Sequence, residues 1–466
     1  MSRPIRLFIP EWVPLANKGE TAIVYGIADG LFPGEPVEIT ALERNMAEPV
    51  FREGIRFWPH RWFYAPWRNR PFSLSLAPKD AFNSGMSLLR HGLELFDGWV
   101  RRPPSPVRNC ARILARLDEG GRADDSAFAK AMRSLREMDH VVVGHDGVLS
   151  HNEECHVIRM LSGAGFSYGV FGTCMPLPLR TRHVHRLYAE MFAEAKYVFT
   201  RNPEGPAWAG EQFPGLGVES APDPAFAMRP ASEDEVDALI GREKLGSFFE
   251  RPVIMMTVVE NDVTLRFGFR KRLTAQGKAR RHVRLAAQLV RAMVKELDAN
   301  ILFLPHCIGP TRLGDDRRVA RAIMAAASAP ADRVRLIERE YDARKLKGLM
   351  ARADLLVAER IHSIIGAVGV HTPFVCLGSM ADNRCTGIVG ALCGAEDLIY
   401  SLDEPDEASL FAHVKDVWRR RGDVRERIEE ADRRIRRQLA VACRSIRARM
   451  KKGRSGAREN APRGAP

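Results

Sequence analysis

Residues 353–377 read ADLLVAERIHSIIGAVGVHTPFVCL. Two short apolar runs, Leu355 to Ala358 and Phe374 to Leu377, flank a segment of small residues, about 363–370, with the composition of a helix. Strand, tight loop, helix and strand in succession form the unit of a parallel sheet. The stretch therefore predicts a parallel α/β domain.

Three polar residues, Glu359, Arg360 and His362, fall where the first of these strands ends and the helix begins. Ligands of open parallel sheets bind at that carboxyl edge. A helix N-terminus also offers free backbone N–H groups to an anion. Arginine and histidine there indicate a site for phosphate or carboxylate. The local pattern leaves a second interpretation open, in which Arg360 pairs with Glu359 and His362 caps the helix.

The length and charge of the chain limit its organisation. A chain of 466 residues is too long for one ordinary core, so two domains plus extensions are expected. The net charge is +13, and the segment from Val441 onward holds eight Lys or Arg against one Glu, or +7. Such basic tails either contact acidic surfaces or only keep a protein soluble, and the second interpretation is favoured slightly.

The eight cysteines are scattered and lack zinc-type spacing, and the one His-x-His, at His183 and His185, lies among arginines that would repel a cation. No metal is therefore expected. The N-terminus lacks a signal-peptide pattern, and no apolar run reaches the roughly 18 residues that a membrane span needs. These features predict a cytoplasmic protein, with contact at the inner face of a membrane through the basic tail left open.

A second strand-and-turn unit opens the chain. The apolar run Ile5 to Pro10 is followed by Asn17-Lys18-Gly19-Glu20, a turn that enters a helix. Gly19 permits close backbone approach, and Asn17 or Glu20 would either bond a ligand or cap the helix. The sequence lacks both G-x-G-x-x-G and the P-loop pattern, so a dinucleotide or Walker-type nucleotide site is not predicted.

Further polar residues follow other predicted strands. His145 and Asp146 end the strand from Asp139, Arg201 follows Tyr197 to Thr200, and His306 follows Ile301 to Leu304. The aromatic segment 57–67 suits either sugar stacking or packing on the sheet, and packing is favoured.

Together these elements predict an α/β fold with two Rossmann-like doubly wound domains facing a cleft, as in B-type (GT-B) glycosyltransferases, and with a C-terminal helical extension. Residues 202–232 hold six prolines and indicate a hinge region. The predicted boundaries are an N-terminal domain on the acceptor side, a linker, a C-terminal domain on the donor side, a charged helical extension and a disordered basic tail: 1–220, 221–249, 250–402, 403–452 and 453–466.

At this point the motifs resemble a known family, the polysaccharide pyruvyl transferases. The order and spacing of the matching segments cover about residues 5–390, and the Arg-Ile-His block is the most specific of them. The segments are Asn17-Lys18-Gly19-Glu20, Val143-Gly144-His145-Asp146-Gly147, Thr200-Arg201-Asn202-Pro203, Asp223-Pro224-Ala225-Phe226, Leu304-Pro305-His306, Glu359-Arg360-Ile361-His362 and Val370-His371-Thr372-Pro373.

The resemblance implies transfer of pyruvate from phosphoenolpyruvate onto two hydroxyls of a sugar, as a ketal, with release of phosphate. The acceptor would be a surface polysaccharide or its lipid-linked precursor; no cofactor beside the co-substrate phosphoenolpyruvate and no specific nucleic acid is expected. By resemblance, the roles are His362 as general acid or phosphate partner, Asp146 as base, donor binding by Arg201, Arg360, His306 and Ser363, and acceptor or loop positions at Asn17, Gly19, Glu20 and His145.

Three residues depart from the family pattern. Glu20 stands in place of an aspartate, His145 stands in a loop normally richer in glycine, and Arg384 stands near the place of a lysine. Two alternatives to the pyruvyl transferase function therefore stay open. One is a GT-B glycosyltransferase that uses a nucleotide sugar, and the other is a non-catalytic binding protein on the same fold.

Overall fold

The structure is a computed structural model. It describes 3–44, 46, 48–60, 134–144, 158, 161–162, 165–175, 182–259, 275–309 and 314–459, without the side chains of 183, 275 and 452–459. The predicted site residues His145 and Asp146 and the aromatic segment beyond His60 lie outside these ranges.

The first sheet has eight strands in the order β3-β4-β2-β1-β5-β6-β7-β8. All its neighbouring strands pair in parallel except β3 and β4, which pair in an antiparallel way. The strands are β1 (Ile5–Trp12), β2 (Val37–Glu43), β3 (Val50–Arg52), β4 (Ile55–Pro59), β5 (His140–Val143), β6 (Tyr168–Thr173), β7 (Val198–Thr200) and β8 (Val218–Ser220).

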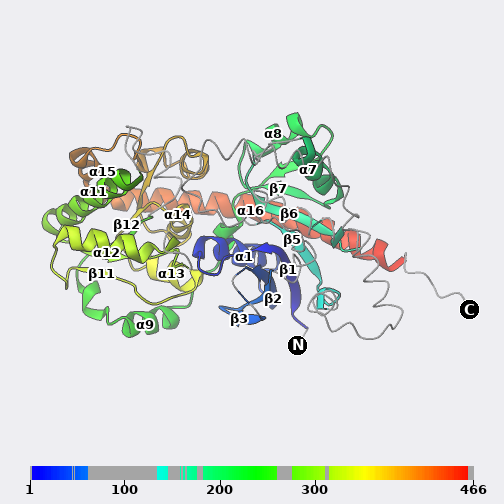
Figure 1. The fold of residues 1–466 in the computed structure, drawn as a ribbon, viewed down its shortest axis with the longest axis horizontal. Coiled ribbons are helices and arrows are strands. Elements are labelled where there is room, and N and C mark those ends of the chain that lie inside the picture. The colour runs from blue at the N-terminus through cyan, green and yellow to red at the C-terminus, as the bar shows by residue number, and fades with distance from the viewer. Residues whose placement is uncertain are drawn as a thin grey trace, which may run out of the picture.

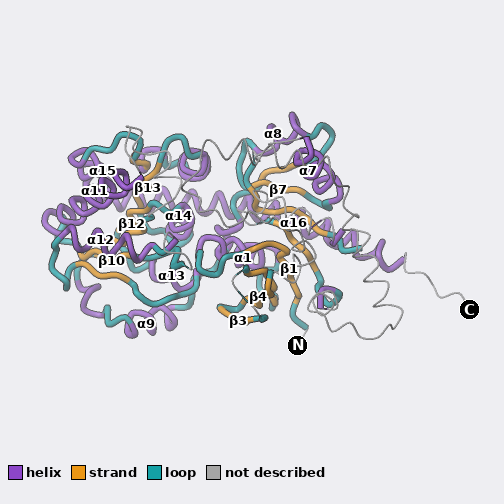
Figure 2. The backbone as a smooth tube through the Cα atoms, in the orientation of Figure 1, coloured by secondary structure: helices purple, strands orange, loops and turns teal. Residues whose placement is uncertain are grey.

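The second sheet has six strands in the order β11-β10-β9-β12-β13-β14, and all its pairs are parallel. They are β9 (Val253–Thr257), β10 (Asn300–Phe303), β11 (Val334–Leu336), β12 (Leu355–Ala358), β13 (Phe374–Gly378) and β14 (Ile399–Ser401). Counted along the chain, this order is that of a doubly wound nucleotide-binding sheet, whose ligand crevice opens where the strand order reverses, here between β9 and β12. Figure 2 shows the two sheets as separate groups of strands.

Alternation along the strands builds two layers of core. In β1, Leu7 and Ile9 face one cluster of buried side chains and Phe8 faces the other, as the period of two in a strand requires. The second cluster lies under α7 (Arg182–Glu194), which contributes Tyr188. The first cluster extends under α1 (Lys18–Leu31) and on through the second sheet.

The remaining helical elements of the described chain lie between the strands or after the last of them. They are α8 (Gly205–Gln212), η2 (Pro224–Ala227), α9 (Glu233–Arg242), η3 (Gly246–Glu250), α11 (Ala275–Glu296), α12 (Asp316–Ala327), α13 (Ala343–Met350), α14 (Ile361–Val368), the π-helical η5 (Cys385–Leu392), η6 (Glu396–Leu398), α15 (Glu407–Arg419) and α16 (Arg421–Glu459).

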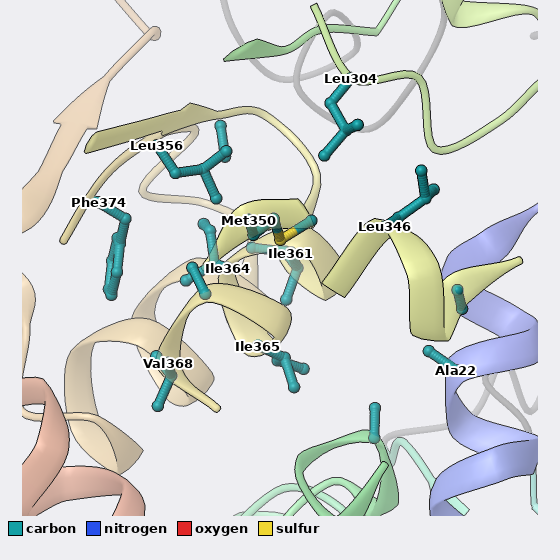
Figure 3. Close-up of a cluster of buried hydrophobic side chains, with 14 of the residues drawn as sticks. Ala22, Leu304, Leu346, Met350, Leu356, Ile361, Ile364, Ile365, Val368 and Phe374 are labelled. Atoms are coloured by element: carbon teal, nitrogen blue, oxygen red, sulfur yellow. The ribbon is translucent and has the colours of Figure 1, made fainter. Parts of the chain in front are cut away.

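One apolar core joins the two sheets. Figure 3 shows Ala22 of α1 opposite Leu346 of α13, with Ile361 and Ile365 of α14 beside Met350. The proline-rich segment predicted as a hinge contributes to this core, because η2 packs tightly against α1: a Cβ on Gly26 would lie 1.9 Å from the Pro224 carbonyl oxygen. The region after β8 is therefore a packed connection, at least through η2.

The charged C-terminal region forms two helices. Helix α15 packs on α11, whereas α16 begins beside α14 and α15 and then reaches α1 and η2 (Figure 1). Near its far end, Arg449 forms an ion pair with Glu219 of β8. The helix continues to Glu459, whereas the sequence predicts a disordered tail from Gly453. Across the described residues, none of the helices combines the length and apolar composition that crossing a membrane requires.

Candidate functional site

The stretch that defines the fold places its polar residues at the edge of the second sheet. Strand β12 ends at Ala358, Arg360 is the residue before α14 with φ −97° and ψ 116°, and α14 begins at Ile361. The first turn of α14 therefore carries His362. Arg360 makes no side-chain cap, so its guanidinium is directed to other partners.

Glu359 is not the partner of Arg360. Its carboxylate accepts hydrogen bonds from the backbone N–H of Val259 at 2.9 Å and contacts His282 Nε2 of α11 at 2.6 Å. Burial lowers the pKa of His282, but Glu359 outweighs this and holds that pKa above its ordinary value. The interpretation in which Arg360 merely pairs with Glu359 is therefore wrong, and Glu359 instead fixes the β9 and β12 ends to α11.

Arg360 pairs with Asp316 at the start of α12. Its Nη2 donates to Asp316 Oδ1 at 2.6 Å, and its Nε lies 3.3 Å from Oδ2. The same carboxylate accepts from the backbone N–H groups of His306 and Cys307. Burial raises the pKa of Asp316 above its ordinary value although Arg360 opposes this. The side chain of Arg360 is 19% exposed.

Arg201 pairs with Asp223 in the first domain, and both side chains are 0% exposed. Its Nη1 donates to Asp223 Oδ2 at 2.7 Å, and its Nε donates to Cys174 Sγ at 2.8 Å. Burial raises the pKa of Asp223, but Arg201 and contacts with His362 hold it below its ordinary value. The carboxylate is thus kept ionised against a buried cation.

His362 reaches this buried pair from the other domain. Its Nε2 lies 3.3 Å from Arg201 Nη1 and 3.7 Å from Asp223 Oδ2. A guanidinium only donates, so the contact with Arg201 is a hydrogen bond when Nε2 carries no proton. The opposite edge of the ring lies against Gly19, where an added Cβ would lie 2.6 Å from Nδ1. Gly19 therefore makes room for the imidazole.

The two turns predicted at the sheet edges meet each other directly. The backbone N–H of Lys18 donates to the His306 carbonyl oxygen at 2.7 Å, and Ile308 N–H donates to the Ala16 carbonyl oxygen at 3.0 Å. Lys18, 1% exposed, donates through Nζ to Glu53 and to Glu340, each at 2.8 Å. Since Glu340 belongs to the second domain, this lysine forms an ion pair between the domains.

The remaining described residues of the predicted site have local roles. The Asn17 side chain accepts from Gly19 N–H at 3.1 Å, which caps α1, and its amide lies 3.5 Å from Glu20 Oε1. Ser363 is buried and bonds to Thr257 at 2.9 Å and to the Arg360 carbonyl oxygen at 2.6 Å. Arg384, at the place of a family lysine, bonds to Asp382 at 2.9 Å.

His306 is buried beside Arg360. Burial and then the positive charge of Arg360 lower its pKa to about 3, which keeps the imidazole neutral. Its Nδ1 is buried and has no hydrogen-bond partner among the described residues.

The structure thus brings together Gly19, Arg201, His306, Arg360 and His362, while Ser363 faces β9. The sequence interpretation omitted two carboxylates from the site, Asp223 and Asp316. Asp223 begins the motif Asp223-Pro224-Ala225-Phe226 and follows β8. Its place in that motif, shortly after a strand, could have identified it as a site residue. The described residues contain no group of three or more His, Cys, Asp or Glu side chains arranged to hold a metal ion.

Comparison with solved structures gives proteins of the same architecture at low identity. Sucrose-phosphate synthase from Thermosynechococcus elongatus has a TM-score of 0.51 and 12% identity over 97% of this chain and 100% of that chain. UDP-GlcNAc 2-epimerase from Neisseria meningitidis has a TM-score of 0.50 and 11% identity, with the same coverage of both chains. A trehalose-6-phosphate synthase has a TM-score of 0.51 and 10% identity over 99% and 100%. These similarities confirm the predicted fold, a two-domain GT-B-like α/β architecture.

Comparison of whole sequences with curated proteins gave no match. The model of one family, polysaccharide pyruvyl transferase, matches residues 17–379. That range begins at the Asn17 turn and includes Arg201, Asp223, Arg360 and His362. The chain belongs to the polysaccharide pyruvyl transferase family.

Proposed function

We propose that the protein transfers pyruvate from phosphoenolpyruvate onto two hydroxyls of a sugar, forming a ketal and releasing phosphate. The observation that carries the proposal is the meeting of His362 with the buried Arg201–Asp223 pair across the two domains. Family membership gives the transferase class, and this meeting supports the assignment of His362 as an acid–base group beside fixed charges.

The reaction needs both acid and base. A proton is added to the methylene carbon of phosphoenolpyruvate, and a sugar hydroxyl bonds to the central carbon while its proton passes to a base. The second hydroxyl then bonds to the same carbon, the C–O bond to phosphate breaks, and the second hydroxyl proton leaves with phosphate or a base. General acid–base assistance to such steps contributes about 10²- to 10⁴-fold.

His362 is the proposed general acid. Its ring is 13% exposed and is held between Gly19 on one side and the Arg201–Asp223 pair on the other. The contacts of Nε2 with Arg201 and Asp223 fix the orientation of the ring, as a group that transfers a proton requires. Asp146, the predicted base, lies outside the described residues, so its role stays a prediction.

The two arginines have different proposed tasks. Arg360 is partly open to solvent, and a guanidinium binds phosphate or carboxylate through two parallel hydrogen bonds. We assign it the direct contact with the donor. Arg201 is sealed, so it acts through Asp223 and His362 as a positioning residue. We keep His306, whose neutral ring is buried beside Arg360, as a proposed donor-binding residue.

The proposed acceptor is a sugar of a surface polysaccharide or of its lipid-linked precursor. It would approach from the side of the first domain, where the Asn17 turn borders the His362 ring. A nucleotide sugar is the donor of the competing glycosyltransferase interpretation, and the ligand test below separates the two.

The test is ligand-dependent thermal stabilisation of the purified protein by phosphoenolpyruvate, UDP-GlcNAc and a GDP-sugar. A ligand at a hundred times its dissociation constant adds about 2.7 kcal/mol to the free energy of unfolding. We expect stabilisation by phosphoenolpyruvate that is lost in Arg360→Ala. The matched control is Arg321→Ala, because Arg321 pairs with Glu338 on the exposed side of α12. Stabilisation by a nucleotide sugar alone would overturn the proposal, as would an equal response to phosphoenolpyruvate in Arg360→Ala.

A further inference from the structure

A second basic site lies far from the cleft. A cavity of about 810 Å³ opens at the start of β1 and β5, with α16 along one wall. These are the amino ends of parallel strands, whereas the cleft is at the carboxyl ends. Strand β1 has eight residues, and a strand rises about 3.3 Å per residue, so roughly 25 Å separates the two edges.

The basic side of the cavity comes from one face of α16. Arg444, Arg447 and Lys451 line it, and their spacing of three and four residues places them on one face of a helix. Within the described part of the chain these three side chains form no ion pair. Of the acidic residues in the wall, Asp139 already binds Arg3 at 2.8 Å, which leaves Glu35 as counter-charge.

The other side of the cavity is apolar. Ile5, Phe32 and Met450 contribute to the lining, and the ring of Phe32 stacks on His140 with 5.4 Å between centroids. Arginine guanidinium groups bind phosphate oxygens through paired hydrogen bonds, while the apolar wall favours removal of hydrocarbon from water. The two halves of the wall therefore match the two parts of an amphiphilic phosphate.

We propose that this cavity, the α16 pocket, binds a phosphate ester that carries an apolar chain. This assignment is independent of the proposed function, because the pocket shares no residue with the cleft. It also accounts for part of the basic charge concentrated after Val441, of which Arg444, Arg447 and Lys451 are members. The source of the ligand is either a bilayer lipid or a dispersed phosphate ester.

The experiment is titration calorimetry of the full chain with dihexanoylphosphatidylglycerol below its micelle-forming concentration. Dihexanoylphosphatidylcholine and sodium phosphate are the comparison ligands. We expect binding of the anionic lipid that weakens at least tenfold in the triple variant Arg444→Gln/Arg447→Gln/Lys451→Gln. The control triple variant Arg425→Gln/Arg433→Gln/Arg437→Gln removes the same charge from the same helix and should bind as the parent does.

An equal loss of lipid affinity in both triple variants would contradict the proposed pocket, because the loss would then follow from the net charge of the surface alone. No binding of the short-chain lipid would overturn it as well, and sodium phosphate binding with equal affinity would overturn the role of the apolar wall. Flotation with vesicles of phosphatidylcholine and phosphatidylglycerol (3:1), lost in the pocket variant, would identify a bilayer as the source. Binding of the short-chain lipid without flotation would identify a dispersed phosphate ester.

Discussion

Arg201 and Arg360 each hold a buried aspartate, but they differ in what else they can reach. Arg201 and Asp223 are both fully enclosed, and the pair contacts His362 from the facing domain. Arg360 holds Asp316 within its own domain and keeps 19% of its side chain exposed. One pair is fully enclosed where the two domains meet, and in the other the arginine is partly exposed at the carboxyl edge of the second sheet.

This difference in exposure distinguishes the structural role of the Arg201–Asp223 pair from the ligand-binding role proposed for Arg360. A sealed ion pair cannot exchange its carboxylate for a ligand without uncovering two charges, and burying an unpaired charge is costly. Arg360 is partly exposed while it holds Asp316, which agrees with the donor contact proposed for it. The two arginines therefore have different proposed roles.

The largest expected effect comes from removing the sealed carboxylate. Asp223→Ala leaves the Arg201 cation buried without its counter-charge, which should lower the free energy of unfolding by about 3–5 kcal/mol. Asp316→Ala should cost less, about 1–3 kcal/mol, because Arg360 reaches water. Urea denaturation of both variants measures the difference. Equal losses in the two variants would show that the sealed and open pairs are energetically alike.

The next effect concerns turnover. His362→Gln should lower kcat for ketal formation by about 10²- to 10⁴-fold, because it removes the proposed general acid. The melting temperature should change little, since the ring is at the edge of the buried pair. His371→Asn is the matched control: His371 has φ 60°, a conformation that asparagine tolerates, and it faces Asp432 away from the cleft. Unchanged turnover in His362→Gln would remove His362 from the chemistry.

A smaller effect is expected from the glycine beneath the imidazole. Gly19→Ala would place a Cβ 2.6 Å from His362 Nδ1, so the ring must shift from its position between Gly19 and the Arg201–Asp223 pair. We expect turnover to fall by about tenfold, as for a misplaced catalytic group. Gly210→Ala is the control, because a Cβ there meets nothing within 4 Å. Both variants behaving alike in steady-state kinetics would contradict the proposed fit.

The smallest effect is a pH dependence of stability. The pKa of His306 is about 3 in the folded protein against an ordinary 6.5, so between these values the unfolded chain binds a proton that the folded chain does not. The free energy of unfolding should therefore fall as the pH drops from 6.5 toward 3. Urea denaturation at pH 7.5 and 5.0 should show a shallower decline for His306→Leu than for the parent. Identical declines would indicate that His306 is protonated in the folded protein.

The sequence predicted best what is local. The strand ending at Ala358, the helix beginning after Arg360 and the parallel sheet around them follow from short apolar runs and small residues. The expectation that packing accounts for the aromatic segment agrees with buried Phe57 and Trp58, the part that is described. The GT-B-like layout could be predicted because repeated strand–helix units are compatible with few topologies. The comparison with solved structures confirmed it.

Partners distant in sequence could not be predicted in the same way. Arg360 has an adjacent glutamate in sequence, yet it pairs with Asp316, 44 residues away. The two residues meet because the first residue of α12 lies in space beside the loop that follows β12. Glu359 turns to His282 on α11. No local pattern distinguishes these pairings, since they depend on how helices cross the edge of the sheet. Lys18 likewise looked like a turn residue, but its ammonium is enclosed between the domains.

Helix α16 has a consequence for how the protein is made. It leaves the ribosome after every other described element, yet it covers residues of the first domain: Cys443 packs beside Gly30, and Arg449 lies over the ring of Phe199. Domains generally fold in order of synthesis. Part of the apolar surface of the first domain therefore stays exposed while the whole second domain is translated. A nascent chain halted before Arg421 should consequently be a client for chaperones that bind exposed hydrophobic surface.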